Sequence, residues 1–274
     1  MSHGLPLSPQ VFAILSALIE ERTGLHYDVQ ERELLAERVS GRATDRGFES
    51  LLDYYYFLRY DPAADAELAL LAEALVVNET YFFRELGPLK VLVSELIPRL
   101  LARGIKPRIW CAACSTGEEP LTLAMLLDEA GLLNQVTLVA SDISARVLAQ
   151  AQGGMYRRRS LRSLPPGVVG RWLEGDENGM RVAAHILRAV AWHRVNLVDE
   201  REAPPLGQFD VIICRNVLIY FRDQTVEKVL DHLWHQLRPD GQLLVGASES
   251  LLRFKVAFAC EEQGGAFFYR KQPK

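Results

Sequence analysis

Hydrophobic positions recur with a helical period through the first third of the chain. After Ser8-Pro9, a pair that suits a helix start because serine caps the first turn and proline fits within it, apolar residues fall on one face until Gly24. The same pattern predicts three further helices, over residues 28–46, 49–59 and 65–76. Because each helix has an apolar stripe that it cannot bury alone, we expect residues 1–76 to form a small helical domain.

From Arg108 the pattern changes to continuous apolar runs of strand length that alternate with helix-length segments. The predicted strands are residues 109–113, 137–141, 209–214 and 241–246, and the predicted helices are residues 118–130, 144–152 and 224–237. Continuous apolar strands joined by helices are typical of a parallel sheet covered on both faces. The fold class is therefore α/β, with a Rossmann-like domain over residues 108–274 and a linker and connecting helix over residues 77–107.

Two segments depart from this alternation. Residues 258–271 are rich in Phe and Tyr around Gly264-Gly265, which predicts a closing antiparallel hairpin. Residues 155–194 begin with a cluster of four arginines, continue with a Pro-Pro pair and glycine-rich turns, and are not needed by the α/β repeat. We interpret this second segment as an inserted small β-subdomain.

Composition and charge narrow the function classes. The 274 residues carry 31 Lys and Arg against 35 Asp and Glu, a net charge of −4. A protein that mainly holds phosphate backbones is usually basic, so a nucleic-acid partner is disfavoured, although a local basic groove stays open. No run of eighteen apolar residues could cross a membrane, and residues 1–10 lack the basic start and apolar run of a signal peptide. We therefore expect a cytoplasmic protein without direct membrane insertion.

The ends of three predicted strands carry the candidate chemistry, because the ligand of an open α/β sheet lies beyond the carboxyl ends of its strands. The first strand runs into Cys-Ala-Ala-Cys-Ser-Thr-Gly-Glu-Glu at residues 111–119, where small residues let a ligand approach the backbone. The second ends at Asp142, at a distance from which a carboxylate can bind both hydroxyls of a ribose. The third ends at Arg215-Asn216.

Two acids separate two classes of nucleotide-type cofactor. Ser115 and Glu118 have the spacing of a capping box, which places a helix start here. A Rossmann dehydrogenase needs a free helix N-terminus for a pyrophosphate, and Glu118 and Glu119 would put negative charge against it. A carboxylate instead pairs with the ammonium group of a methionine-like moiety. The run therefore favours S-adenosylmethionine, which carries no phosphate, while a role of both acids in stabilising the first helical turn stays open.

The four cysteines do not predict a metal site. Cys111 and Cys114 have the spacing of a metal or redox pair, but zinc would need a second pair, and Cys214 and Cys260 lie far apart. Cysteines inside apolar runs are usually small buried hydrophobic residues in a reducing compartment. We therefore expect no metal.

Four motifs, in order over nearly the whole chain, resemble the CheR methyltransferases. They are Asn78-Glu-Thr-Tyr-Phe-Phe-Arg-Glu85, Trp110-Cys-Ala-Ala-Cys-Ser-Thr-Gly-Glu-Glu-Pro120, Ala140-Ser-Asp-Ile143 and Phe209-Asp-Val-Ile-Ile-Cys-Arg-Asn-Val-Leu-Ile-Tyr-Phe221. The resemblance implies a glutamate O-methyltransferase that uses S-adenosylmethionine and releases S-adenosylhomocysteine. Its substrates would be the cytoplasmic helical domains of chemoreceptors, which are methylated in chemotaxis.

The resemblance also implies roles for individual residues. Arg84 would pair with the cofactor carboxylate, since a guanidinium grips a carboxylate bidentately, and Tyr220 would approach the transferred methyl group as the second catalytic residue. Glu118 or Glu119 would hold the cofactor amino group, and Asp142 the ribose. The rest of the cofactor pocket would consist of Asn78, Thr80, Ala112, Asn196, Leu197, Asn216 and Val217. Structural roles stay open for three of these residues: Asn78 as a helix cap, Asn216 as a turn residue and Tyr220 as a core tyrosine.

The implied chemistry needs little from acids and bases. A carboxylate nucleophile is already ionised at neutral pH and a sulfonium is an activated methyl donor, so the enzyme mainly aligns oxygen, methyl carbon and sulfur. We therefore expect neither a catalytic dyad nor a metal. Two other interpretations stay open: a methyltransferase of small molecules or RNA, and a regulatory module that binds cofactor or receptor without turnover.

Two further features bear on the receptor. Arg38, Arg42 and Arg46 recur every four residues on one predicted helix, in a domain with 6 Lys and Arg against 13 Asp and Glu. This basic row could bind rows of receptor glutamates, or it could be a solvated face paired with neighbouring acids. The short stretch 173–182 in the insertion suggests that a C-terminal receptor pentapeptide is not required.

Overall fold

The computed structural model describes residues 4–176 and 178–273, and the chain divides into two compact units. The first unit contains Met1–Val77 together with Tyr220–Thr225, and the second contains the remaining residues. Of residues 77–107, expected as a linker and connecting helix, all but Val77 belong to the second unit, because apolar side chains between Leu89 and Ile97 are part of its core.

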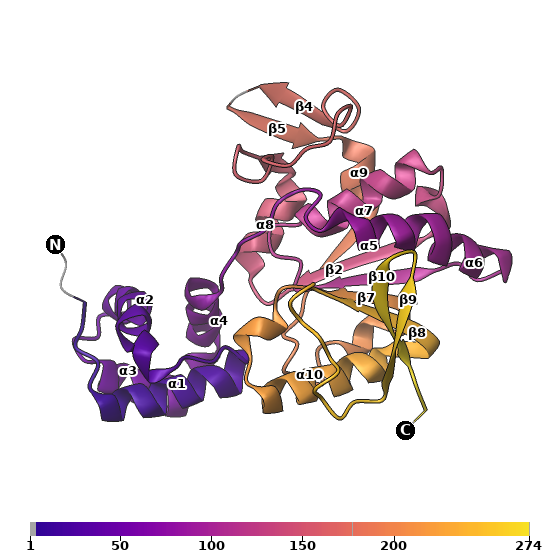
Figure 1. Cartoon of the computed structure of the whole chain (residues 1–274). Helices are drawn as coiled ribbons and strands as arrows, with labels where there is room; N and C mark the ends of the chain where they lie inside the picture. Colours follow the sequence, from indigo (N-terminus) through magenta and orange to yellow (C-terminus); the bar gives the residue numbers. More distant parts are fainter. Residues whose placement is uncertain (1–3, 177, 274) are drawn as a thin grey trace. The chain divides into compact units, whose positions relative to one another are not determined.

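The first unit is the helical bundle that the sequence predicts (Figure 1). Its helices are α1 (Pro9–Thr23), α2 (Arg32–Asp45), α3 (Leu51–Tyr60) and α4 (Ala64–Leu75). Helix α1 begins at the Ser8 cap and ends at Gly24 with φ at 79°, as expected. The second helix begins later than expected, because a 3-10 turn over Val29–Glu31 precedes it.

The apolar faces of these helices meet in one core, which includes the fully buried Leu15, Leu35 and Tyr54. Two later residues, Tyr220 and Phe221, pack against the same core. The backbone carbonyl of Tyr220 accepts a hydrogen bond from the N–H of His26 at 2.9 Å. The segment after the third predicted strand therefore contributes to the helical unit.

The second unit is built on a seven-stranded sheet with the order β6-β2-β1-β7-β8-β10-β9. Pairing is parallel from β6 to β8 and antiparallel through the final hairpin. The strands are β1 (Arg108–Ala112), β2 (Thr137–Asp142), β6 (Val190–Arg194), β7 (Phe209–Cys214), β8 (Leu237–Val245), β9 (Phe258–Gln263) and β10 (Ala266–Lys271). The predicted mixed α/β architecture is confirmed.

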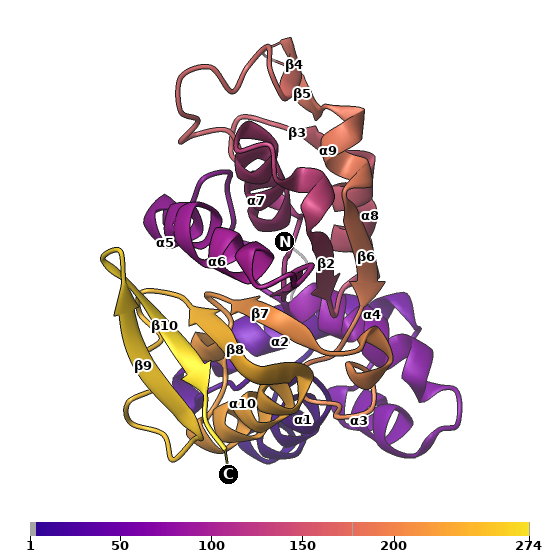
Figure 2. The same ribbon diagram turned by 90° about the vertical axis from the view of Figure 1, so that its right-hand side faces the viewer.

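Helices cover both faces of this sheet (Figure 2). One face carries α5 (Leu86–Val91), α6 (Ile97–Ala102) and α7 (Glu118–Glu129), whose apolar side chains share a core with strands β1, β2 and β7. The other face carries α10 (Asp223–Gln236). Helix α8 (Ala145–Gly153) follows β2. A sheet buried on both faces explains why its strands are continuous apolar runs.

The insertion forms a small antiparallel sheet of order β3-β5-β4. Its strands are β3 (Met155–Tyr156), β4 (Leu173–Asp176) and β5 (Gly179–Val182), followed by α9 (Ala184–Arg188). The expected end of the insertion at residue 194 needs correction, because residues 190–194 pair with β2 and form the edge of the main sheet. Residue 177, in the stretch expected to bear on the pentapeptide, lies outside the described residues.

Candidate functional site

The carboxyl ends of the parallel strands lie at one edge of the main sheet. Ala112 is in register with Ser141 on one side and with Cys214 on the other. The chain runs outward from β1 through β2 to β6 and then returns to β7 on the other side of β1. An open α/β sheet binds its ligand at such a reversal of strand order. The segments that follow β1, β2, β6 and β7 therefore meet at one place.

The run after β1 is shaped by a glycine rather than by a capping box. Helix α7 begins at Glu118, and its N-cap is Gly117 with φ at 91° and no side-chain capping bond. A Cβ at Gly117 would lie 2.7 Å from Ala151 and 2.9 Å from Trp192, so only glycine fits. The expected capping box of Ser115 and Glu118 does not form, because Ser115 adopts a left-handed conformation (φ 49°) and its N–H donates to Asp142.

Asp142 is a buried carboxylate at the end of β2. Its Oδ2 accepts the N–H of Ser115 at 2.8 Å, and its Oδ1 accepts the N–H of Ser144 at 3.0 Å. The hydroxyl of Ser115 also donates to Oδ1 of Asn78 at 3.4 Å, so these three segments are linked. Burial raises the pKa of Asp142 above its ordinary value, although the backbone donors act in the opposite direction. A carboxylate can accept about four hydrogen bonds, so acceptor capacity remains.

The two adjacent acids of α7 have different surroundings. Glu118 is 1% exposed and accepts the hydroxyl of Thr116 at 2.6 Å, whereas the side chain of Glu119 is 16% exposed and lies 2.8 Å from Nη1 of Arg215. Burial raises the pKa of both acids, and Arg215 partly offsets this for Glu119. Only Glu119 therefore combines partial exposure with a cationic neighbour.

Arg215 links three segments from a buried position. Its Nη2 lies 3.0 Å from the carboxylate of Glu85 and donates to the carbonyl of Arg84 at 3.1 Å. Glu85 has a left-handed backbone (φ 45°), and the contact of its carboxylate with Arg215 helps to hold that conformation. Burial alone would raise the pKa of Glu85, but Arg215 and neighbouring donors hold it below its ordinary value. Nε of Arg215 is buried and has no hydrogen-bond partner within the described residues.

Arg84 is half-buried in the segment that precedes α5. Its Nη1 donates to the carbonyl of Glu79 at 2.7 Å, and its guanidinium carbon lies 5.9 Å from the ring centroid of Tyr81. The carboxylate of Glu79 pairs with Arg159 and Arg162 of the insertion, so part of the basic cluster fixes this segment. Thr80, in the same motif, is also half-buried.

The remaining expected residues follow β6 and β7. The N–H of Val195 donates to the carbonyl of Asp142 at 3.0 Å, which brings the next two residues, Asn196 and Leu197, close to that strand end. Asn216 has φ at 57° and donates from Nδ2 to Glu85 at 3.3 Å. The half-buried side chains in this group are Asn196, Leu197, Asn216 and Val217, and Ala112 is buried at the end of β1.

The structure places Tyr220 with the first unit, where it packs against the helical core. This contact matches the structural role that the sequence left open. Tyr220 has hydrogen-bonding or electrostatic contacts of its own. Its catalytic role stays a prediction.

Sequence reasoning missed two acids of this network. Glu85 stands in a quoted motif but was given no role. Glu249 follows β8, a strand that was predicted but whose end was not considered. It is 5% exposed and accepts N–H bonds from the segment that begins at Asn216. A fourth strand end with an acidic residue was the signal that could have revealed it.

The three arginines of the row, Arg38 and Arg42 in α2 and Arg46 directly after it, have partners within the helical unit. Arg42 lies 3.5 Å from Asp45, one of the neighbouring acids expected for a solvated face. Arg42 makes two hydrogen bonds, at 2.8 and 3.0 Å, to Glu67, which is 2% exposed on α4. Arg46 lies 3.5 Å from the same carboxylate, and Arg38 donates to the carbonyl of Leu75 at 2.6 Å. The row therefore joins α2 to α4, while the side chain of Arg46 stays 45% exposed.

Three of the four cysteines are core residues. Cys111, Cys114 and Cys214 are buried free thiols whose pKa values are raised by burial, and Cys260 is exposed. Within residues 4–176 and 178–273, no group of three or more His, Cys, Asp or Glu could hold a metal ion. None of the helices in this part of the chain is long and apolar enough to cross a membrane.

Two family models match the chain. The model described as CheR methyltransferase, SAM binding domain, matches residues 78–266, and the model described as CheR methyltransferase, all-alpha domain, matches residues 10–76. Chemotaxis protein methyltransferase 2 of Vibrio cholerae is 34% identical over 87% of this chain and 84% of its own length. The chemotaxis protein methyltransferase of Vibrio parahaemolyticus is 36% identical over 90% and 91%. Chemotaxis protein methyltransferase 1 of Pseudomonas aeruginosa is 31% identical over 88% and 90%.

Proposed function

The chain belongs to the CheR methyltransferase family, and on that premise we propose that it methylates glutamate side chains of chemoreceptor cytoplasmic helical domains. The family match confirms the resemblance carried by the four sequence motifs, and S-adenosylmethionine is the cofactor. The activity is S-adenosylmethionine-dependent protein methylation in chemotaxis. The glutamate, its receptor domain, the cytoplasmic location and the roles of individual residues are the finer proposal.

The observation that carries this proposal is a pair of carboxylates near the strand ends that can still accept hydrogen bonds from a ligand. Asp142 and Glu119 each keep acceptor capacity beside their protein partners. The first turn of α7 carries Glu118 and Glu119, so this helix N-terminus is unsuited to a phosphate. These acceptors therefore fit a cofactor that donates from hydroxyl and ammonium groups and carries no phosphate, such as S-adenosylmethionine.

Each part of the cofactor has a matching residue in this proposal. Arg84 would bind the carboxylate, and Asp142 would bind the ribose hydroxyls. Glu119 is favoured over Glu118 for the ammonium group, because the buried Glu118 is engaged by Thr116. The remaining pocket residues would be Asn78, Thr80, Ala112, Asn196, Leu197, Asn216 and Val217.

S-adenosylmethionine supplies an activated methyl group when bound. The glutamate that accepts it is already ionised at neutral pH, so this chain needs to bind and orient the reactants rather than to remove a proton. Alignment of reacting groups can supply much of the rate enhancement. Tyr220 is proposed to lie against the reacting methyl group, on the basis of its place in the matched motif.

The proposal also concerns which macromolecules this chain binds. The receptor's helical surface would meet the side chain of Arg46, which is 45% exposed although its Nε lies 3.5 Å from Glu67. A C-terminal receptor pentapeptide would not be required, because the stretch 173–182 of the sequence is short at this place. A nucleic-acid substrate is disfavoured by the overall acidic charge of −4.

Transfer of a labelled methyl group tests this function. The protein is incubated with tritium-labelled S-adenosylmethionine and purified receptor cytoplasmic domains, and label is then released with mild base. Base-labile label on the receptor supports a glutamate methyl ester. Label on RNA or on small molecules alone, or binding of cofactor without any transfer, would contradict it.

A further inference from the structure

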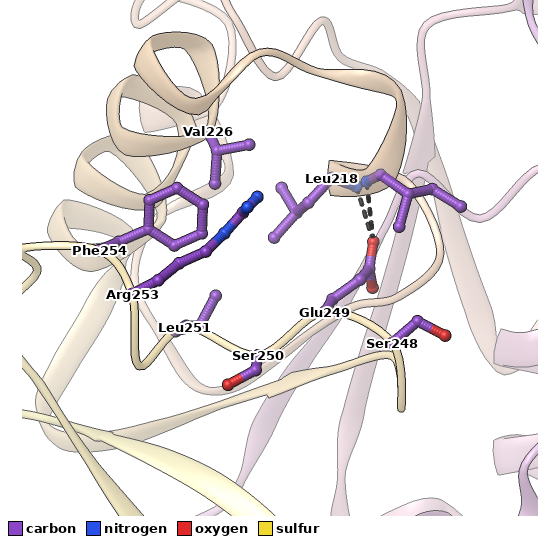
Figure 3. Close-up of a pocket in the computed structure, with 9 residues that line it drawn as sticks. Leu218, Val226, Ser248, Glu249, Ser250, Leu251, Arg253 and Phe254 are labelled. Atoms are coloured by element: carbon purple, nitrogen blue, oxygen red, sulfur yellow. Dashed lines mark hydrogen bonds between the residues drawn. The ribbon is translucent and has the colours of Figure 1, made fainter.

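One buried carboxylate holds the loop that follows β7. The Glu249 side chain points at the backbone of the 218–219 turn (Figure 3). Oε1 and Oε2 together accept five backbone N–H groups, those of Asn216 (2.6 Å), Val217 (2.8 Å), Leu218 (2.7 Å), Ile219 (3.3 Å) and Gly246 (2.8 Å). A single side chain therefore ties the segment after β7 to the segment after β8.

The backbone conformation of the segment after β7 explains why an anionic side chain stabilises it. Asn216 is left-handed, and a 3-10 turn over Leu218–Tyr220 follows, so consecutive N–H groups converge. Such a concavity of N–H groups binds anions, and hydrogen bonds to a charged acceptor are stronger than neutral ones. Among the described residues Glu249 has no ion-pair partner, so these N–H groups are what balances its charge.

The outer side of this loop faces an open cavity. Glu249, Leu218 and Ile219 line an open cavity of about 290 Å³, together with Arg253 and Phe254 (Figure 3). Ile219 is 54% exposed, so the carboxylate restrains the backbone of this residue where side-chain packing does not.

Gly246 is the residue that lets the carboxylate approach. A Cβ at Gly246 would lie 2.7 Å from Oε2 of Glu249 and 2.9 Å from Nδ2 of Asn216. The carbonyl of Gly246 also accepts the N–H of Glu249 at 2.9 Å, which closes the turn between them. The backbone and the side chain thus form one unit that requires both a glycine and a glutamate.

We propose that Glu249 is a positioning residue for methyl transfer, which sets the place of Asn216 and Val217 in the cofactor pocket through their backbone N–H groups. The inference rests on the proposed function, because those two residues are assigned to that pocket. A carboxylate with a merely structural role would stabilise the unit without setting cofactor affinity. Loss of a positioning carboxylate should weaken cofactor binding, whereas an equally destabilising loss of a purely structural carboxylate should not.

The test compares Glu249→Gln with Asp210→Asn. Asp210 is a buried carboxylate at the opposite end of β7, where it binds the N–H of Arg108 at 2.8 Å and Arg238 at 2.9 Å. Both variants should lower Tm, whereas Glu249→Gln alone should raise the Kd for S-adenosylhomocysteine, measured by calorimetry, about tenfold or more. An unchanged Kd in Glu249→Gln, or an equal rise in both variants, would overturn the proposal.

Two further variants separate position from charge. Gly246→Ala keeps the carboxylate but blocks its approach, so its Kd should rise as in Glu249→Gln. Glu249→Asp keeps two charged acceptors on a shorter side chain, so its Kd should fall between the wild type and Glu249→Gln. Amide hydrogen exchange at residues 216–219 should accelerate in the same order. Slow exchange in Glu249→Gln would show that the carboxylate does not hold the loop after β7. Failure of the wild type to bind S-adenosylhomocysteine would instead refute the proposed function.

Discussion

Nη1 of Arg215 lies 2.8 Å from Oε2 of Glu119, and this ion pair distinguishes Glu119 from the adjacent Glu118. Arg215 partly offsets the rise in the pKa of Glu119 that burial causes, while Glu118 is turned into the core towards Thr116. The sequence left open which of the two would hold a cofactor ammonium group. The pairing gives that choice a structural basis.

Neutralising the two acids should therefore have unequal effects on cofactor affinity. Glu119→Gln should raise the Kd for S-adenosylhomocysteine about tenfold, roughly 1.4 kcal/mol, because a charged contact is lost. Glu118→Gln, its matched control, should leave the Kd within about a factor of two. Calorimetric titration of both variants measures this, and the reverse ranking would assign the ammonium contact to Glu118.

The pH dependence of stability should change when Glu118 is neutralised. Burial raises its pKa in the folded chain, so the folded state binds this proton more tightly than the unfolded state does. This group therefore adds to the free energy of unfolding as pH falls through the folded pKa, and the gain is complete below its ordinary pKa. Glu118→Gln cannot titrate, so its advantage over the wild type should be largest at neutral pH and shrink on acidification.

Denaturant unfolding of both proteins at several pH values measures that difference. Glu129→Gln, which changes an exposed acid at the other end of α7, serves as the control. A gap between Glu118→Gln and the wild type that stays constant from neutral to acidic pH would show that Glu118 has no raised pKa.

Tyr220→Phe should lower turnover more than it lowers cofactor affinity. The ring packs against the helical core, and the substitution retains that apolar contact, so Tm should change little. Turnover on receptor and the Kd for S-adenosylhomocysteine are measured on the same preparation. Phe221→Leu is a control for packing alone. Equal turnover in Tyr220→Phe and the wild type would leave Tyr220 as a core aromatic residue.

Two arginines of the row should differ in role: Arg42 in α2 is structural, whereas Arg46, directly after α2, is exposed. Arg42→Ala removes two hydrogen bonds from the buried Glu67 and should cost about 3 kcal/mol of unfolding free energy, because this buried carboxylate loses its closest cationic partner and keeps only the more distant Arg46. Arg46→Ala should affect stability less. It should raise the Michaelis constant for receptor and weaken its dependence on salt.

Arg59→Ala is a suitable control for Arg46→Ala, because Arg59 is another exposed arginine of the helical unit, paired with Glu21. Cofactor affinity should be unchanged in both variants. If Arg46→Ala and Arg59→Ala share the same receptor kinetics from low to high salt, the exposed end of the row does not bind the receptor.

Periodicity was sufficient to predict most of the elements, because buried strands and one-sided helices each leave a repeating apolar pattern. The strand at residues 209–214 and the helix of residues 118–130 were placed within one residue. The apolar pattern did not set the bounds of β6, the strand that precedes Asn196 and Leu197, since it is an edge strand whose side chains are mostly exposed and mixed in character. Edge strands lack the two-sided burial that makes the central strands recognisable.

Contacts between distant segments were beyond the reach of the sequence pattern. Ser115 has the spacing of a capping residue, but its backbone is turned to reach Asp142, 27 residues later. Arg42 of α2 likewise binds Glu67 of α4, 25 residues later. Local spacing predicts local bonds, whereas these residues are placed by the tertiary fold.

The helical unit draws its last six residues, Tyr220–Thr225, from late in the chain. A ribosome that has released residues 1–77 has therefore not yet supplied the backbone carbonyl that His26 binds, nor the ring of Phe221. Domains usually fold in order from the N-terminus during synthesis. Here the earliest-made domain can reach its final state only after most of the later one has been translated, so a nascent chain arrested before residue 220 should hold an incomplete bundle.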